Sequence, residues 1–515
     1  MKSFNTAGTC RPNEHYMVDI TERLEIIRKM VAKGDYFCIN RGRQYGKTTT
    51  LEAISQRLSD EYCVLKISFE GVDDSVFKTA STANANFLKR LKREARNVDA
   101  NVWEYLKSVC PPDLSAMEDI DFSEVVEEIC TISAKPVIVL VDEVDQAGNN
   151  EGFIKFLGGL RTMYLDRATH PTFQSIILAG VYDIKNLKLK MRPEEEHQYN
   201  SPWNIAVPFD VDMSLPAKGI AGMLDDYAKE HEIQFDTVFI GQLIHDYTSG
   251  YPFLVSRLCQ IIDNKQYSWD KEGVLRAVND ILVERNTLFD NMIKKLDEYP
   301  ELKQILKGIL LSGKAKTYNP DEKYIQIASM FNYIVNKDGK VAVACRIMET
   351  RLYNLFISEE ENSSFFMQGQ IDKSEFVKDG IIDMAHLMER FIVHMNQTYK
   401  MDRDTEFIEN DARKVFLTYL RPVINGTGSY HIEEQTRDHD RMDVVIDYSG
   451  HQYVIELKIW RGNAYNERGE EQLRRYLEYF NLNKGYLLSF CFNKNKKPGI
   501  QEVKVGDRTI IEAIV

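Results

Sequence analysis

A short apolar stretch that leads into a glycine-containing loop constrains the fold of this chain most strongly. Residues 36–39 read Tyr-Phe-Cys-Ile, and residues 40–50 continue as Asn-Arg-Gly-Arg-Gln-Tyr-Gly-Lys-Thr-Thr-Thr before a run with helical periodicity. We expect a buried strand, a tight loop and a helix in that order. Gly46-Lys47-Thr48 at the start of the helix is typical of loops that hold phosphate groups. Glycine lets backbone N–H groups come close to a phosphate, and the helix N-terminus favours an anion.

The residue types in this loop suit a nucleoside triphosphate. Lys47 would place an ammonium on the β- and γ-phosphates, and the Thr48 hydroxyl would ligate Mg²⁺. The usual pattern is displaced here, because its first glycine position is held by Arg41 and Gly42 stands one position later. A Gly-Lys-Thr triplet can also begin an ordinary helix, and the loop alone leaves that alternative open. The residues predicted to contact the nucleotide are Gly42, Arg43, Gln44, Tyr45, Gly46, Lys47, Thr48 and Thr49.

A second motif follows about 95 residues after Lys47. Residues 136–141 carry no charge and are followed by Asp142 and Glu143. Such a run predicts a strand that is buried on both faces, as in a parallel sheet. Ligands of open α/β sheets bind at the carboxyl ends of the strands, so Asp142 is predicted to support Mg²⁺ and Glu143 to polarise an attacking water. The alternative is a solvated turn after a buried strand. Together the two motifs predict that ATP and Mg²⁺ are cofactors.

Composition limits the classes that the protein can belong to. A chain of 515 residues is too long for one ordinary core, so two to four domains are expected. The net charge of −13 argues against a general nucleic-acid coat, so any contact with nucleic acid must be local. The eight cysteines lie far apart without a Cys-x-x-Cys pair, and there is no run long and apolar enough to span a membrane. We therefore expect a soluble, cytoplasmic protein with no membrane association.

The first 290 residues resemble a known family. Strand-like stretches at residues 62–69 and 175–181 alternate with helical ones, which predicts an α/β doubly wound sheet, and Gly250-Tyr251-Pro252 opens an apolar helix. With the displaced loop and the acidic strand end, these features resemble the prokaryotic AAA-like P-loop ATPases related to the STAND group. The resemblance implies the roles given above for the loop and the strand-end carboxylates. It also implies a helical lid that carries the nucleotide state to an effector. No arginine is assignable as a finger, so a homo-oligomer stays an open alternative.

Residues 300–355 predict a compact connector. Helical runs are followed by two alternating stretches around Asp338-Gly339, a pattern typical of a β-hairpin. Helices with a terminal hairpin resemble a winged helix, which can bind DNA or join domains rigidly. The carboxylates of Asp321, Glu322 and Asp338 dilute its basic charge and favour the connector.

The last 115 residues carry a second chemical constellation. Two strand-like stretches form an apparent hairpin in which Asp443 and Glu456 lie on neighbouring strands, and Lys458 shares a strand face with Glu456. Two carboxylates beside a lysine supply oxygens for Mg²⁺ and an ammonium that orients water, as metal-assisted phosphodiester cleavage requires. A solvent-facing row of polar side chains is the alternative.

Residues 400–515 resemble the PD-(D/E)XK nuclease superfamily. The resemblance rests on Asp443, on Glu456-Leu457-Lys458 after a gap of twelve residues, and on Gln472 in a following helix; Met442 stands where the family has proline. It implies a restriction-endonuclease-like α/β fold, metal binding by Asp443 and Glu456, and assistance to water by Lys458. It also implies that Glu409 completes the metal shell. The substrate would be nucleic acid, with DNA favoured. The phosphate backbone of the nucleic acid would be attracted by a basic patch formed by Arg461, Arg468, Arg474 and Arg475.

The sequence thus predicts an ATPase whose nucleotide state controls a C-terminal Mg²⁺-dependent nuclease, in defence against foreign or mobile DNA. The main alternative is an ATP-dependent switch whose C-terminal domain binds nucleic acid or protein without cleaving. A third is a translocase, which would require a ring. The expected domains are an ATPase core (residues 1–213), a helical lid (214–290), a winged-helix-like connector (291–358), a linker with one helix (359–399) and the nuclease-like domain (400–515).

Overall fold

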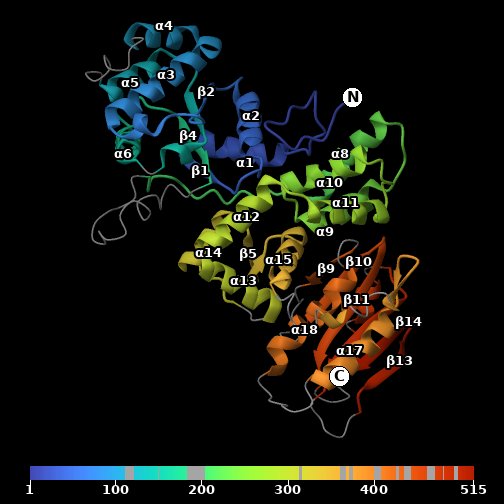
Figure 1. Ribbon diagram of the computed structural model, residues 1–515. Helices are drawn as coiled ribbons and strands as arrows, with labels where there is room; N and C mark the ends of the chain where they lie inside the picture. Colours follow the sequence, from blue (N-terminus) through green and yellow to red (C-terminus); the bar gives the residue numbers. More distant parts are fainter. Residues whose placement is uncertain are drawn as a thin grey trace. The chain divides into compact units, whose positions relative to one another are not determined.

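The computed structural model comprises two compact units (Figure 1). Unit 1 contains Met1–Ser214 and Met330–Asn332, and unit 2 contains Leu215–Ser329 and Tyr333–Val515. The residues that the structure describes are 1–110, 121–148, 150–181, 203–312, 316–359, 367–369, 375–398, 407–424, 428–433, 442–460, 470–471, 473–478, 481–491 and 497–515.

A four-stranded parallel sheet organises unit 1, with the strand order β1-β4-β3-β2. Its strands are β1 (Phe37–Asn40), β2 (Cys63–Ser68), β3 (Val137–Asp142) and β4 (Ser175–Gly180). Every residue of β3 and β4 is buried, which is why these stretches read as continuous apolar runs. An isolated parallel bridge from Phe37 to Val207 extends the edge beyond β1.

Helices cover both faces of this sheet, as the alternation in the sequence predicts. One hydrophobic core joins alternate strand residues to α1 (Thr21–Ala32) and α2 (Lys47–Leu58). The core on the opposite face involves α3 (Ala80–Val98), α4 (Ala100–Val109), α5 (Phe122–Ile132) and α6 (Glu151–Leu165). The helical region between residues 80 and 109 is divided into α3 and α4. Asp99 breaks it, because its carboxylate caps α4 by accepting the N–H groups of Asn101 and Val102.

Unit 2 begins with four helices that we call the helical segment. They are α8 (Ala217–Glu230), α9 (Thr237–Thr248), α10 (Pro252–Asn264) and α11 (Lys271–Val283). Between α9 and α10, Ser249 and Gly250 have positive φ, and Pro252 occupies the first turn of α10. A Cβ at Gly250 would lie 2.3 Å from the carbonyl oxygen of Leu215, so this turn requires glycine.

The next part of unit 2 contains the expected hairpin. Strands β5 and β6 are antiparallel, and Asp338 and Gly339 between them both have positive φ, as a two-residue type I′ turn demands. The elements here are α12 (Thr287–Glu298), α13 (Pro300–Ser312), α14 (Lys323–Met330), β5 (Ile334–Lys337), β6 (Lys340–Val343) and α15 (Arg346–Ser358).

The part of unit 2 from residue 375 onward, which we call the C-terminal domain, contains a six-stranded mixed sheet with the order β13-β14-β12-β11-β10-β9. Helices α17 and α18 contact one face of the sheet, and Leu473 and Leu477 pack on the other (Figure 1). The elements are β7 (Val377–Lys378), β8 (Ile381–Ile382), α17 (Met384–Thr398), α18 (Phe407–Ile424), β9 (Gly428–Glu433), β10 (Met442–Tyr448), β11 (His451–Ile459), β12 (Lys484–Phe490), β13 (Gly499–Val505) and β14 (Arg508–Ile514).

Within the residues predicted as a linker with one helix (359–399), helix α17 begins at Met384. Ile381 and Ile382 pair with Val377 and Lys378 as a small hairpin before the helix. Across the described part of the chain, no helix is both long and apolar enough to cross a lipid bilayer.

Candidate functional sites

The loop between β1 and α2 turns tightly at two left-handed residues. Gln44 has φ of 58° and Gly46 has φ of 76°. Gly46 is the N-cap of α2 and brings no side chain to the first-turn N–H groups of that helix. Successive N–H groups in such a turn form a concave surface that suits an anion. The glycine at position 46 is therefore required by the backbone conformation of the loop.

Lys47 is the first residue of α2, directly after this loop, and only 7% of its surface is exposed. Its Nζ donates hydrogen bonds to the carbonyl oxygens of Arg41 (2.9 Å) and Gly42 (3.0 Å). Burial lowers the pKa of this ammonium, and the carboxylates of Asp145 and Glu143 act in the opposite direction. An ammonium held by neutral carbonyls can exchange these acceptors for phosphate oxygens, which are stronger partners.

The displacement of the first glycine has a packing explanation. Arg41 donates to the carbonyl oxygens of Asn40 (2.8 Å) and Val211 (3.0 Å), so a long side chain is accommodated at this position. Gly42 admits none, because a Cβ there would lie 2.6 Å from the carbonyl oxygen of Phe331. The Gly42 N–H donates to Asn332 Oδ1 at 2.7 Å. Gly42 does not have a positive φ, so its backbone conformation does not require glycine. The close approach of the Phe331 carbonyl is what requires it.

The other predicted loop residues differ in their exposure. Arg43 is exposed, whereas Gln44, Tyr45, Thr48 and Thr49 are partly buried. The Thr49 hydroxyl accepts the N–H of Cys10 at 3.2 Å, which ties the N-terminal segment to α2.

Asp142 and Glu143 stand at the carboxyl end of β3, one strand away from β1 across β4. Asp142 is buried, and its Oδ1 accepts the Glu143 N–H at 2.9 Å. Glu143 has φ of 52° and ψ of 42°, a left-handed backbone conformation that residues other than glycine rarely adopt. Residues in such strained conformations cluster at functional sites. Burial raises the pKa of its carboxyl, and the neighbouring charge of Asp142 raises it further. Both features suit a group that exchanges a proton.

Asp145 belongs to this site, although the sequence motifs did not assign it a role. Its carboxylate accepts the N–H of Val181 at 2.5 Å and so joins the end of β3 to the end of β4. A Cβ at Gly180 would lie 2.8 Å from Asp145 Oδ1, which explains that glycine. Asp145 is also the strongest opposing charge on Lys47. The available signal was a third acidic residue just past Asp142 and Glu143, on the first turn after the strand.

In the C-terminal domain, β10 and β11 pair antiparallel and set Asp443 opposite Glu456, as the hairpin prediction requires. Glu456 and Lys458 share a face of β11, with 0% and 1% of their side chains exposed. Lys458 Nζ lies 3.8 Å from Glu456 Oε1. A solvent-facing polar row is thereby excluded for these two residues. The pair lies toward the carboxyl end of β11, which runs parallel to β12.

Glu512 is a further buried carboxylate on this sheet and was missed at the sequence level. The register Glu456–Leu487–Glu512 across β11, β12 and β14 puts it on the face that Glu456 occupies. It is 1% exposed and accepts a hydrogen bond from Gln501 Nε2. The signal was an acidic residue inside the apolar run of residues 510–515.

Some of the predicted groups fall outside what the structure describes. The backbone places Glu409 in α18 and Asp443 in β10, but their side chains are not described, and Gln472, Arg461 and Arg468 lie outside the described residues. Among the side chains that are described, no three His, Cys, Asp or Glu groups gather as a metal site. Of the predicted basic patch, Arg474 pairs with Glu471 and Glu478 on its own helix.

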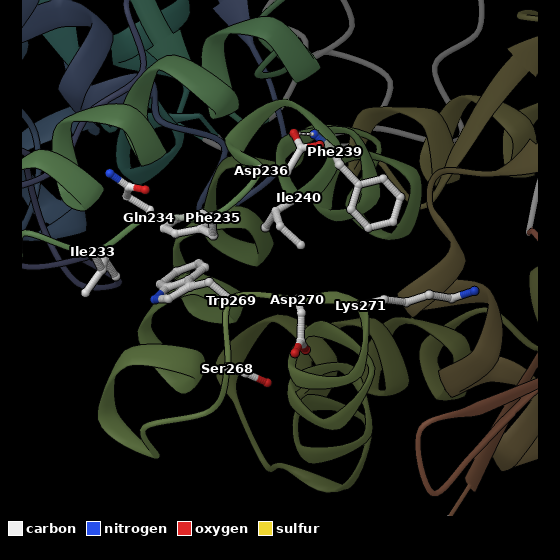
Figure 2. Close-up of a pocket in the computed structure, with 10 residues that line it drawn as sticks. All are labelled: Ile233, Gln234, Phe235, Asp236, Phe239, Ile240, Ser268, Trp269, Asp270 and Lys271. Carbon is white, nitrogen blue, oxygen red and sulfur yellow. Dashed lines mark hydrogen bonds between the residues drawn. The ribbon is translucent and has the colours of Figure 1, made fainter.

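A pocket of 540 Å³ lies in the helical segment, between the turn before α9 and the turn before α11 (Figure 2). Phe235 and Trp269 stack in its wall with ring centroids 5.2 Å apart. Its two aspartates have structural roles, because Asp236 caps α9 and Asp270 caps α11. None of the predicted site residues lines this pocket.

Comparison with known proteins assigns no family to the chain. No family model matches, and no curated protein matches. Among solved structures, a Walker-type ATPase of Pyrococcus abyssi is 15% identical with a TM-score of 0.45, covering 68% of this chain and 99% of that one. The ORC2 protein of Aeropyrum pernix is 11% identical with a TM-score of 0.33, covering 70% and 98%. RuvB of Thermotoga maritima is 10% identical with a TM-score of 0.32, covering 67% and 95%. The function must therefore be argued from the residues of the two sites.

Proposed function

We propose that this protein binds and hydrolyses ATP in unit 1 and that its nucleotide state controls a Mg²⁺-dependent nuclease in the C-terminal domain. One observation carries the proposal. Lys47 is a buried ammonium whose Nζ is held by two carbonyls of a glycine loop, and acidic residues at the carboxyl end of β3 are its main opposing charges. This combination of a buried cation and nearby carboxylates is suited to binding a polyanion together with a divalent cation.

In this proposal each residue of the nucleotide site has a separate task. The loop N–H groups and Lys47 bind the β- and γ-phosphates, while Thr48 and Asp142 hold Mg²⁺. The bound metal ion would neutralise charge that develops on the transferred phosphoryl group. Glu143 orients the attacking water, and its raised pKa suits proton transfer. Asp145 keeps the two strand ends in place through the Val181 N–H.

The burial of Glu456 and Lys458 supports the nuclease half of the proposal. Removing a carboxylate and an ammonium from water costs several kcal/mol per ion, and a buried ion pair is weak evidence for stability. A catalytic task is a sufficient reason to retain these charges. Glu456 and Asp443 would hold Mg²⁺ with Glu409 completing the shell, and Lys458 would orient the attacking water. DNA is the favoured substrate, and defence against foreign DNA is the role that we propose.

One observation favours the alternative of an ATP-dependent switch whose C-terminal domain binds without cleaving. Arg474 of the predicted basic patch is neutralised by Glu471 and Glu478, which weakens attraction to a phosphate backbone.

We retain the division of the chain at residues 213, 290, 358 and 399 as part of the proposal.

A matrix of cleavage assays tests both halves. The protein is incubated with labelled single- and double-stranded DNA and RNA, with Mg²⁺ or EDTA, and with or without ATP. We expect Mg²⁺-dependent cleavage whose rate differs between the two nucleotide conditions. Binding without cleavage in every Mg²⁺ arm would establish the switch instead. A mass measurement with and without ATP tests assembly into a homo-oligomer.

A further inference from the structure

A buried polar cluster joins the helical segment directly to the C-terminal domain within unit 2. Tyr247 of α9 is 2% exposed, and its hydroxyl donates to Asp447 Oδ2 of β10 at 2.5 Å. Gln452 of β11 donates its Nε2 to the same hydroxyl at 3.4 Å. Asp447 and Gln452 are direct cross-strand partners, so one phenol contacts both strands of the hairpin.

Two cations from other helices face this cluster. The guanidinium of Arg346, the first residue of α15, lies 5.9 Å from the centre of the Tyr247 ring. Lys271, the first residue of α11, acts electrostatically on Asp447. The β10–β11 turn is also in close contact with α11, because a Cβ at Gly450 would lie 2.8 Å from Glu272 Cγ. Helices α9, α11 and α15 therefore all meet one end of the hairpin.

The hydrogen bonds of this cluster oppose small displacements of α9 relative to the β10–β11 hairpin. Burial raises the pKa of Asp447, and it raises the pKa of Tyr247 as well. A small displacement of α9 would leave a buried carboxylate and a buried phenol without their hydrogen bond, and such a loss costs the full desolvation of both groups. An apolar contact would tolerate the same displacement with less penalty. The helical segment must therefore carry the hairpin with it or break the cluster.

The same two strands carry the candidate nuclease site. Asp443 and Glu456 form a cross-strand pair four residues away from the pair of Asp447 and Gln452. At roughly 3.3 Å per residue, the two pairs are about 13 Å apart along the hairpin. The two strands are paired with each other from Met442 to Tyr448 and also with β9 and β12, so the Asp443–Glu456 and Asp447–Gln452 pairs belong to one continuous hydrogen-bonded ladder.

We propose that Tyr247 is a positioning residue for the C-terminal site and makes that site respond to the helical segment. This inference rests on the proposed function and deepens it. Tyr247 touches no reacting atom; it acts through Asp447 and Gln452, which fix the hairpin on which Asp443 and Glu456 stand. The link is direct and does not pass through the β5–β6 hairpin.

Hydrogen exchange on the full chain provides the first test. Tyr247→Phe removes the hydroxyl and keeps the ring. The matched control is Tyr227→Phe, because the Tyr227 hydroxyl also donates to an aspartate, Asp263 at 2.6 Å, but inside the helical segment. We expect exchange in residues 450–459 to rise roughly tenfold in Tyr247→Phe, as loss of a buried hydrogen bond predicts, and to stay unchanged in the control. Equal exchange in Tyr247→Phe and the parent overturns the inference, whether or not the protein cleaves nucleic acid.

The second test measures how the cleavage rate depends on bound nucleotide. Substitution of a residue that only stabilises the fold would leave this dependence unchanged as long as the protein is folded. The readout is the ratio of Mg²⁺-dependent cleavage rates with a non-hydrolysable ATP analogue and without nucleotide, at a temperature where all variants are folded. We expect the ratio to approach one in Tyr247→Phe and in Asp447→Leu, and to be kept in Asp447→Asn, which retains an acceptor. A parent that never cleaves refutes the proposed function, and the exchange result then decides the inference alone. If Tyr247→Phe keeps the parental ratio of cleavage rates, the inference is overturned.

Discussion

Glu456 Oε1 and Lys458 Nζ lie 3.8 Å apart on the same face of β11, and almost none of either side chain is exposed. Removing two opposite charges from water together costs several kcal/mol per ion, so a buried ion pair is weak evidence for stability. The candidate nucleotide site also contains ionisable groups removed from water, since Lys47 is buried and Glu143 is partly buried. Both candidate sites therefore hold charges whose removal from water costs free energy.

Lys47→Ala should weaken ATP binding by roughly tenfold to a hundredfold. The substitution removes the ammonium that would contact the β- and γ-phosphates, and a hydrogen bond to a charged group contributes about 1.5–3 kcal/mol. Titration calorimetry measures the Kd. Lys66→Ala is the control, because Lys66 is in the same unit but forms an ion pair with Glu52. Equal ATP affinity in Lys47→Ala and the parent would show that the loop is not a phosphate site.

Glu143→Gln should keep ATP binding and reduce hydrolysis by about 10²- to 10⁴-fold, because the amide retains the shape but cannot accept a proton. The base must be ionised to act. Burial raises the pKa of Glu143, so hydrolysis by the parent should fall with decreasing pH at a higher pH than for an ordinary glutamate. The rate of phosphate release against pH measures this limb. Normal turnover in Glu143→Gln would place the base elsewhere.

Asp443→Ala and Glu456→Ala should each abolish Mg²⁺-dependent cleavage and leave ATP hydrolysis at the parental rate, because the two proposed sites belong to different units. Both rates are measured on the same preparation. Glu456→Ala also leaves the Lys458 ammonium buried without its neighbour, which costs about 3–5 kcal/mol, so the folded state is checked by circular dichroism. Simultaneous loss of both activities in a folded variant would indicate a shared site.

Gly42→Ala should lower the free energy of unfolding of unit 1 by about 1–3 kcal/mol, the usual cost of overpacking. The added Cβ would meet the Phe331 carbonyl oxygen at 2.6 Å. Gly158→Ala in α6 is the matched control, since a Cβ there meets nothing within 4 Å and alanine favours a helix by about 1 kcal/mol. Thermal unfolding of the two variants should shift in opposite directions. A neutral Gly42→Ala would mean that the segment containing Phe331 does not pack closely on the loop.

Local sequence patterns predicted the elements of both sites, but not every residue that completes them. The strands before Asn40 and Asp142, the Asp338-Gly339 hairpin and the pairing of Asp443 with Glu456 follow from apolar runs, alternation and turn chemistry. Asp145 and Glu512 were missed because each acts across a strand pairing: Asp145 on the Val181 N–H, and Glu512 one strand beyond Leu487. A motif describes neighbours in the chain and contains no information about which strand lies alongside.

The amino-acid sequence by itself determined that a glycine loop enters a helix at Lys47, that two carboxylates end a buried strand, and that Glu456 and Lys458 share a strand face. Those properties depend on backbone periodicity and on residues that are close in the chain. Only the tertiary structure decided that Gly42 is needed for the approach of Phe331, that Glu456 and Lys458 are buried, and that Tyr247 binds Asp447. The Tyr247–Asp447 hydrogen bond joins residues 200 positions apart, and the Gly42–Asn332 hydrogen bond joins residues 290 positions apart. Burial and long-range hydrogen bonds arise from packing of whole elements, which no local pattern encodes.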